Sequence, residues 1–206
     1  IEECLDNDIL KRGVNGIVST NAIHLYYELE QTLGSWKKIL RPDGYLHVQS
    51  GNIRNPSNKD SWIIDETVEH LNNAAIRLVA SQDSFISLRK FLDNDEHMKA
   101  HDRLREKYFL PVRDLDYYTK SLKENGFEIK DTQCHPINAS VDEWYDFLSV
   151  YHEGVLGWVG GAEKVYNKKV SSHFVSLRKA LMRLAMEDIF NGSDSFQAAW
   201  TYINAQ

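Results

Sequence analysis

Two histidines have a spacing that is able to hold a metal ion. His97 and His101 are four residues apart in a segment, 93–108, that we predict to be helical, so both rings fall on one face. The metalloprotease pattern His-Glu-x-x-His is absent, however. The neighbouring charged residues indicate a solvated surface: Asp95, Glu96, Lys99 and Asp102. We therefore predict no metal site.

Other patterns of reactive residues are sparse. Gly157, Gly160 and Gly161 lack the Lys-Ser/Thr pair that completes a phosphate-binding loop. The sequence contains no Gly-x-Ser-x-Gly nucleophile motif, and Cys4 and Cys134 form no Cys-x-x-Cys pair. Any chemistry must therefore come from polar residues that the fold brings together.

The elements that would position such residues begin with residues 14–49. Val14–Thr20 is short and rich in β-branched residues, as buried strands are. Residues 25–40 carry apolar side chains at three-to-four spacing and predict a helix, which the turn Arg-Pro-Asp-Gly (41–44) should end before a second strand at 45–49. This order predicts a βαβ unit with two parallel strands.

The rest of the chain alternates helices with two further strands. We predict helices at 65–79, 84–91, 93–108, 115–124, 141–150 and 167–190. We predict strands at 127–135, ended by Pro136, and at 196–203. The prediction is a single α/β domain, residues 1–206, with helical insertions at about 53–112 and 138–195.

Charge and hydropathy exclude two classes of partner. The net charge of −6 disfavours a nucleic-acid partner, which needs clustered Lys and Arg. No apolar run approaches the roughly 20 residues that span a bilayer, and the first residues do not resemble a signal peptide. We expect a cytoplasmic protein with a small-molecule substrate and no membrane partner.

Three segments, taken in order, resemble the second half of the class I S-adenosylmethionine (SAM)-dependent methyltransferases of the type 11 kind. Residues 16–24 are similar to the family's fourth strand and the loop after it. Residues 36–46, with Leu-Arg-Pro-Asp-Gly, are similar to the helix end before its fifth strand. Residues 122–129, with Asn-Gly-Phe, are similar to the entry to its sixth strand. The resemblance implies a Rossmann-like sheet of parallel strands with an antiparallel last strand.

The resemblance implies SAM as the cofactor. Ser19, Thr20 and Asn21 match the loop that passes beside the cofactor, and His24 matches a position near the transferred methyl, where it could act as a general base or as a helix-cap residue. The family's glycine-rich cofactor motif and its ribose-binding acidic residue are not in this sequence. Ile1 aligns just past the family's third strand, so we expect the chain to be the carboxy-terminal part of the enzyme and not to bind SAM alone.

The acceptor would be covered by the helical insertions. Six aromatic or histidine side chains in these regions are candidates for its pocket, although each also suits a core: Trp62, His70, Tyr108, Tyr151, His152 and Trp158.

Two other functions remain open. The chain could be a non-catalytic binding or homo-oligomerisation module, because unpaired strand edges favour self-association. A Rossmann-type oxidoreductase is a weaker alternative, because no nicotinamide loop or Tyr-x-x-x-Lys pair is present.

Overall fold

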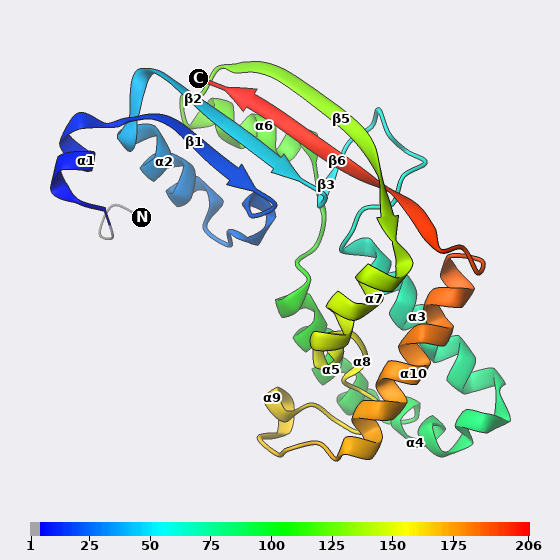
Figure 1. Ribbon diagram of the computed structural model, residues 1–206. Helices are drawn as coiled ribbons and strands as arrows, with labels where there is room; N and C mark the ends of the chain where they lie inside the picture. The colour runs from blue at the N-terminus through cyan, green and yellow to red at the C-terminus, as the bar shows by residue number, and fades with distance from the viewer. Residues whose placement is uncertain (1–4) are drawn as a thin grey trace. The chain divides into compact units, whose positions relative to one another are not determined.

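The protein was analysed as a computed structural model that describes residues 5–206 (Figure 1). Its strands are β1 (Val14–Thr20), β2 (Leu40–Ser50), β3 (Ile53–Arg54), β4 (Arg113–Asp114), β5 (Ile129–Ser140) and β6 (Ser195–Ala205). Its longer helices are α2 (Leu29–Ile39), α3 (Glu66–Ser81), α5 (Asp95–Tyr108), α6 (Leu115–Glu124), α7 (Val141–Val150) and α10 (Ser172–Ile189). Its shorter helices are α1 (Asn7–Arg12), α4 (Arg89–Leu92), α8 (His152–Leu156) and α9 (Glu163–Tyr166), with 3₁₀ turns η2 (Ile23–Leu25) and η3 (Asp83–Leu88).

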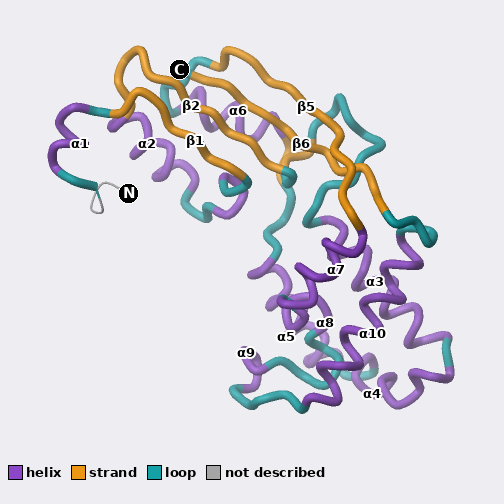
Figure 2. The backbone as a smooth tube through the Cα atoms, in the orientation of Figure 1, coloured by secondary structure: helices purple, strands orange, loops and turns teal. Residues whose placement is uncertain are grey.

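The chain divides into two compact units. The first, which we call the sheet unit, contains the residues up to Ile64, Val112–Ile137 and Ala198–Gln206. The second, the helical unit, contains Asp65–Pro111 and Asn138–Gln197, two segments that lie largely within the ranges where the sequence predicts insertions. Figure 2 shows that strands dominate the first unit and helices the second.

The main sheet has four strands in the order β1-β2-β6-β5. β1 and β2 are parallel, with Ile17 opposite Leu46 and Thr20 opposite Gln49. β6 runs antiparallel to β2 and lies between β2 and β5. The predicted α/β class, with parallel neighbours joined through a helix and an antiparallel last strand, is confirmed.

Helices α2 and α6 cover one face of this sheet (Figure 1). Leu33 and Trp36 of α2 and Leu122 of α6 are buried with Val48 and other strand residues in one hydrophobic cluster. Burial of one side chain of this size contributes about 1.5–3 kcal/mol to the stability of the fold, relative to an exposed position. The opposite face is open at Val18 and Tyr45, which are 70% and 62% exposed.

The helical unit has its own core. Helices α3 and α10 pack together, and their buried residues include Leu71, Ala75, Leu181 and Met182. None of the helices within residues 5–206 is long and apolar enough to cross a membrane.

Four predicted boundaries need correction. The helix predicted from residue 25 begins at Leu29, because η2 forms first and leaves Leu25 49% exposed. The turn predicted at 41–44 is absorbed into β2, where the register against β1 shifts between Val14 and Gly16. β5 continues through Pro136 to Ser140, because an edge strand tolerates a residue without an N–H. The last long helix begins at Ser172, after Asn167 has ended α9 in a left-handed conformation.

The prediction that His97 and His101 lie on a solvated surface is also wrong. His97 is 9% exposed and His101 2% exposed, so this face of α5 points into the helical unit. The charged neighbours lie on the rest of the helix. They make the sequence of α5 so polar that its buried face is not apparent from composition.

Candidate functional site

A sharp turn follows the carboxyl end of β1. Asn21 has a φ of 47°, in the left-handed region that asparagine tolerates better than most residues. Its backbone N–H donates to the Gln49 carbonyl at 2.8 Å, and its Oδ1 accepts from the Gly51 N–H at 3.2 Å and the Ser50 hydroxyl at 3.3 Å. These bonds connect the turn after β1 to the carboxyl end of the neighbouring parallel strand, where open α/β sheets bind ligands.

His24 belongs to the same polar network. Its Nε2 lies 3.0 Å from the Asn52 amide nitrogen, which can only donate, and its Nδ1 lies 3.1 Å from the Ser50 oxygen. Nε2 is therefore the acceptor and Nδ1 carries the proton, which it donates to Ser50. Ser50 in turn donates to Asn21, so the imidazole fixes the side chain at the turn.

Burial lowers the pKa of His24 to about 4. The imidazole is consequently neutral at pH 7 and a weak base. In this arrangement both ring nitrogens are bonded to neighbouring side chains, and the sequence-predicted role of His24, a general base or a helix-cap residue, stays a prediction.

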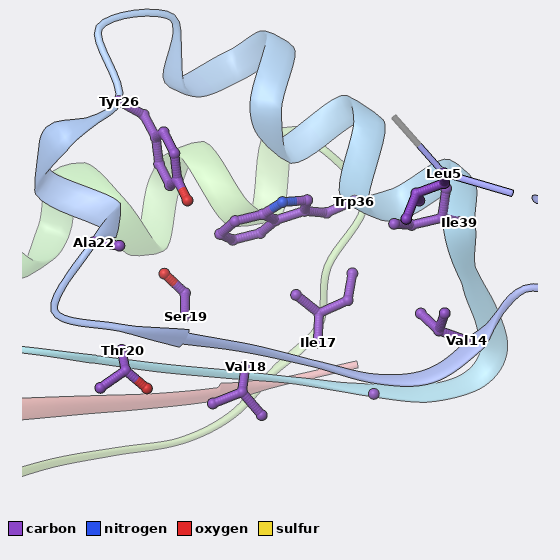
Figure 3. A pocket seen from close by; sticks show the side chains of 11 residues that line it. Leu5, Val14, Ile17, Val18, Ser19, Thr20, Ala22, Tyr26, Trp36 and Ile39 are labelled. Atoms are coloured by element: carbon purple, nitrogen blue, oxygen red, sulfur yellow. The ribbon is translucent and has the colours of Figure 1, made fainter. Parts of the chain in front are cut away.

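A cleft of about 510 Å³ runs along β1 (Figure 3). Consecutive residues 16–20 line it, so it follows the strand edge that does not pair with β2. The full lining is Leu5, Val14, Gly16, Ile17, Val18, Ser19, Thr20, Ala22, Tyr26, Trp36 and Ile39. Its volume is within the usual range for small-molecule sites.

The cleft contains one polar atom whose bonding is incomplete. Ser19 is 4% exposed, and its hydroxyl has no hydrogen-bond partner among residues 5–206. Figure 3 shows this hydroxyl on the side of β1 that faces Tyr26 and Trp36, while Val18 and Thr20 point the other way. A buried hydroxyl without a partner costs about 1–3 kcal/mol, which a ligand with a suitable polar atom would recover.

Two aromatic rings form the opposite wall. Tyr26 and Trp36 meet edge to face, with centroids 5.7 Å apart and planes at 87°. Trp36 is held by the core, at 3% exposure. The cleft therefore combines aromatic surface, chiefly that of the partly exposed Tyr26, with the Ser19 hydroxyl and the backbone edge of β1 that no other strand within residues 5–206 pairs with.

The predicted cofactor residues are grouped by the fold. Ser19 and Thr20 line the cleft, and Asn21 lies at its end in the network with His24. The sequence prediction missed Ser50 and Asn52. The available signal was their position just after the second parallel strand, because the carboxyl ends of adjacent parallel strands meet at one edge.

The six predicted acceptor residues do not form one cluster. Trp62 belongs to the sheet unit, where its carbonyl accepts from the Ala199 N–H at 2.8 Å. His70 is exposed on α3 of the helical unit. Tyr108 and Tyr151 do meet, with ring centroids 6.0 Å apart.

The other two lie deeper in the helical unit. His152 Nδ1 is 3.1 Å from the Arg178 guanidinium, which together with burial lowers the His152 pKa. Trp158 is completely buried, and its indole N–H donates to Asn72 at 2.9 Å, which is the packing of a core residue.

The histidine pair on α5 is not arranged around a metal. His97 Nδ1 lies 2.7 Å from the Tyr166 hydroxyl and Nε2 lies 2.7 Å from the Trp158 carbonyl, so both nitrogens are occupied. No group of three or more metal-binding side chains is found within the described part of the chain.

Comparison with solved structures finds α/β proteins of low identity. The YcgJ protein from Bacillus subtilis matches with 13% identity and a TM-score of 0.46, over 94% of this chain and 63% of that one. The [4+2]-cyclase SpnF matches with 11% identity and a TM-score of 0.41, over 98% and 53%. Phosphoethanolamine N-methyltransferase 2 from Haemonchus contortus, solved with S-adenosylhomocysteine, matches with 10% identity and a TM-score of 0.37, over 93% and 33%.

The chain thus spans less than two thirds of the length of these structures. No protein-family model and no curated protein matches the sequence.

Proposed function

We propose that the chain forms part of a SAM-dependent methyltransferase that acts on a small molecule. The observation that carries the proposal is the pairing of the left-handed Asn21 turn with the buried, unpartnered Ser19 hydroxyl, at the carboxyl end of β1. The sequence resemblance, which implies SAM as the cofactor, supports the proposal because it points to the same residues.

The residues present suit one wall of a nucleoside site. Ser19 would hydrogen-bond a polar atom of the ligand, and Tyr26, which the buried Trp36 supports, would supply aromatic surface to its ring. The Asn21 turn would present exposed backbone at the end of the strand, held in place by Ser50 and Gly51. When bound, SAM supplies an already activated methyl group on a sulfonium centre.

In this proposal His24 is a positioning residue. A neutral imidazole that donates to Ser50 and accepts from Asn52 keeps the turn in one conformation at pH 7. Methyl transfer depends chiefly on alignment of the reacting atoms, so a fixed turn contributes more here than a weak base would. The net charge of −6 supports a small-molecule acceptor over a nucleic acid.

The test is calorimetric titration of S-adenosylhomocysteine (SAH) into the full-length protein and its Ser19→Ala variant. We expect the variant to bind SAH about 5- to 30-fold more weakly, which corresponds to the loss of one hydrogen bond of about 1–2 kcal/mol. Without ligand, the same variant should be as stable as the parent or more stable, because it removes an unsatisfied buried hydroxyl.

Thr132→Ala is the matched control, because this exposed hydroxyl on β5 lies outside the cleft. Equal SAH affinity in the parent and Ser19→Ala proteins would contradict the assignment of the cleft. We also expect the 206 residues alone to bind no SAH, because the glycine-rich motif and the ribose-binding acid are not among them.

A non-catalytic self-association module is the second candidate. β1 is an edge strand with the sequence VNGIVST, which contains no charged residue and no proline, and Val18 is 70% exposed. Natural edge strands are usually protected from pairing by charged side chains or proline. Absence of SAH binding by the full-length protein, together with a dimer in analytical ultracentrifugation that Val18→Lys dissociates, would favour this function.

A further inference from the structure

A second cleft lies in the helical unit, between α5 and the end of α9. Its volume is about 530 Å³, and its lining residues come from one helix and one tyrosine: Asn94, Glu96, His97, Lys99, Ala100, Arg103 and Tyr166. It shares no residue with the cleft along β1. All of its lining side chains belong to the helical unit.

The floor of this cleft is held in a fixed arrangement. The Trp158 carbonyl can only accept, so His97 donates to it from Nε2, and Nδ1 must then accept the Tyr166 hydroxyl proton, both at 2.7 Å. The two rings also stack, with centroids 5.8 Å apart and planes at 9°. Asn94 Oδ1 accepts from the His97 backbone N–H at 3.0 Å and caps α5. A ligand would therefore meet a preformed surface.

The cleft carries unbalanced positive charge. Lys99 and Arg103 are exposed and one helical turn apart, and neither makes an ion pair with any residue from 5 to 206. Like charges at this spacing repel each other, so the pair weakens α5 slightly on its own. Glu96 is the one acidic side chain in the lining, which leaves a net charge of about +1 in a chain whose total is −6.

We propose that this cleft binds a small anion through a phosphate or carboxylate group placed between Lys99 and Arg103. Arg103 offers a planar fork of donors that matches either group, and Lys99 adds a point charge. The Tyr166 ring, 49% exposed, forms the side of the cleft against which the body of the ligand would lie. This inference does not depend on methyl transfer.

Calorimetric titration of the protein with inorganic phosphate and, separately, with citrate tests the proposal at low ionic strength. We expect millimolar or tighter binding of at least one of them, weakened 10-fold or more in the double variant Lys99→Gln/Arg103→Gln. The two probes distinguish a phosphate site from a carboxylate site. Lys107→Gln is the control, because this exposed lysine lies on the same helix but outside the cleft.

A second variant should act in the opposite direction. Glu96→Gln removes the acidic group from the lining, so the same anion should bind about threefold more tightly. All three side chains are exposed, so their substitution should leave the packing of α5 intact. Far-UV circular dichroism checks that each variant is folded. Anion affinity that is equal in the parent and the double variant, or absence of binding of both probes at 10 mM, would overturn the proposal. The SAH titration uses a different ligand, so the two proposals fail separately.

Discussion

Each unit of the molecule contains a histidine whose pKa burial lowers to about 4, and the two histidines differ in their hydrogen bonding. His24 in the sheet unit and His101 in the helical unit both have pKa values lowered to about 4, chiefly by burial. His24 exchanges hydrogen bonds with Ser50 and Asn52, whereas neither ring nitrogen of His101 has a partner among residues 5–206.

The difference shows that burial lowers a histidine pKa to about 4 whether or not the ring is hydrogen-bonded. His101 fills space beside Gly157, where its Nδ1 would lie 3.1 Å from an added Cβ, and its ring meets His97 and Tyr166 edge to face. Burial is the main cause of its low pKa, and the charges of His97 and Arg178 lower the pKa further. His24 has a similarly lowered pKa, but its ring nitrogens bond the side chains of Ser50 and Asn52, next to the Asn21 turn.

The largest expected effect comes from Arg178, the buried cation near His101. Arg178 is completely buried and donates to the carbonyls of Gly157, Val159 and Gly161. Its pKa, lowered by burial to about 10, still leaves it charged at pH 7. Arg178→Met should lower the free energy of unfolding by about 3–5 kcal/mol, because three carbonyls and Glu153 lose their partner.

Urea unfolding followed by circular dichroism measures this loss. Arg77→Met is the control, since Arg77 is 64% exposed and pairs with Asp188 at the surface. Its removal should cost about 0–1 kcal/mol. Equal losses in the two variants would show that Arg178 does not organise the 157–161 turn.

Replacing each histidine by leucine should change the free energy of unfolding in opposite directions at the two sites. His101→Leu should leave stability unchanged or raise it by about 1–2 kcal/mol, because it removes two unsatisfied buried nitrogens. His24→Leu should lower stability by about 1–3 kcal/mol, because Ser50 and Asn52 lose a partner. Urea unfolding at pH 7 measures both.

SAH affinity adds a readout that packing alone would not move. We expect His24→Leu to weaken SAH binding and His101→Leu to leave it unchanged. If both substitutions changed stability in the same direction and SAH affinity equally, the distinction between the two histidines would be lost.

The smallest effect concerns pH. Both pKa values lie below the ordinary 6.5, so between pH 6.5 and about 4 the unfolded chain binds protons that the folded protein does not. Stability should therefore be complete above pH 6.5, fall as the pH is lowered through this window, and show no further contribution from these groups below it. Because carboxylates titrate in the same range, the informative quantity is the difference between the parent and His101→Leu, which should be less sensitive to pH from 6.5 to 4. Parallel curves for the two proteins would contradict the lowered pKa of His101.

Local patterns were enough to predict several elements of this fold. Val14–Thr20, Leu115–Glu124 and Val141–Val150 have the predicted bounds, since the patterns that define them lie within each segment or in the residues directly beside it. The length of β5 was missed because tolerance of Pro136 depends on the strand being at an edge, which only the sheet order reveals.

The sequence prediction identified the candidate site on one strand only. Ser19, Thr20 and Asn21 follow directly from the strand end, whereas Ser50 and Asn52 join them through pairing of β1 with β2. The burial of His97 and His101 could not be inferred from a helix with so many charged residues, because the residues that cover them, 158 and 166, lie far along the chain.

The position of β6 has a consequence for how the protein is made. Because β6 lies between β2 and β5, the centre of the sheet stays vacant until residues 198–205 have left the ribosome. The helical unit also waits for α10, whose partner α3 is synthesised about a hundred residues earlier. Neither unit can complete its packing until these late segments have emerged, so apolar surfaces of β2 and α3 stay exposed while the intervening residues are synthesised.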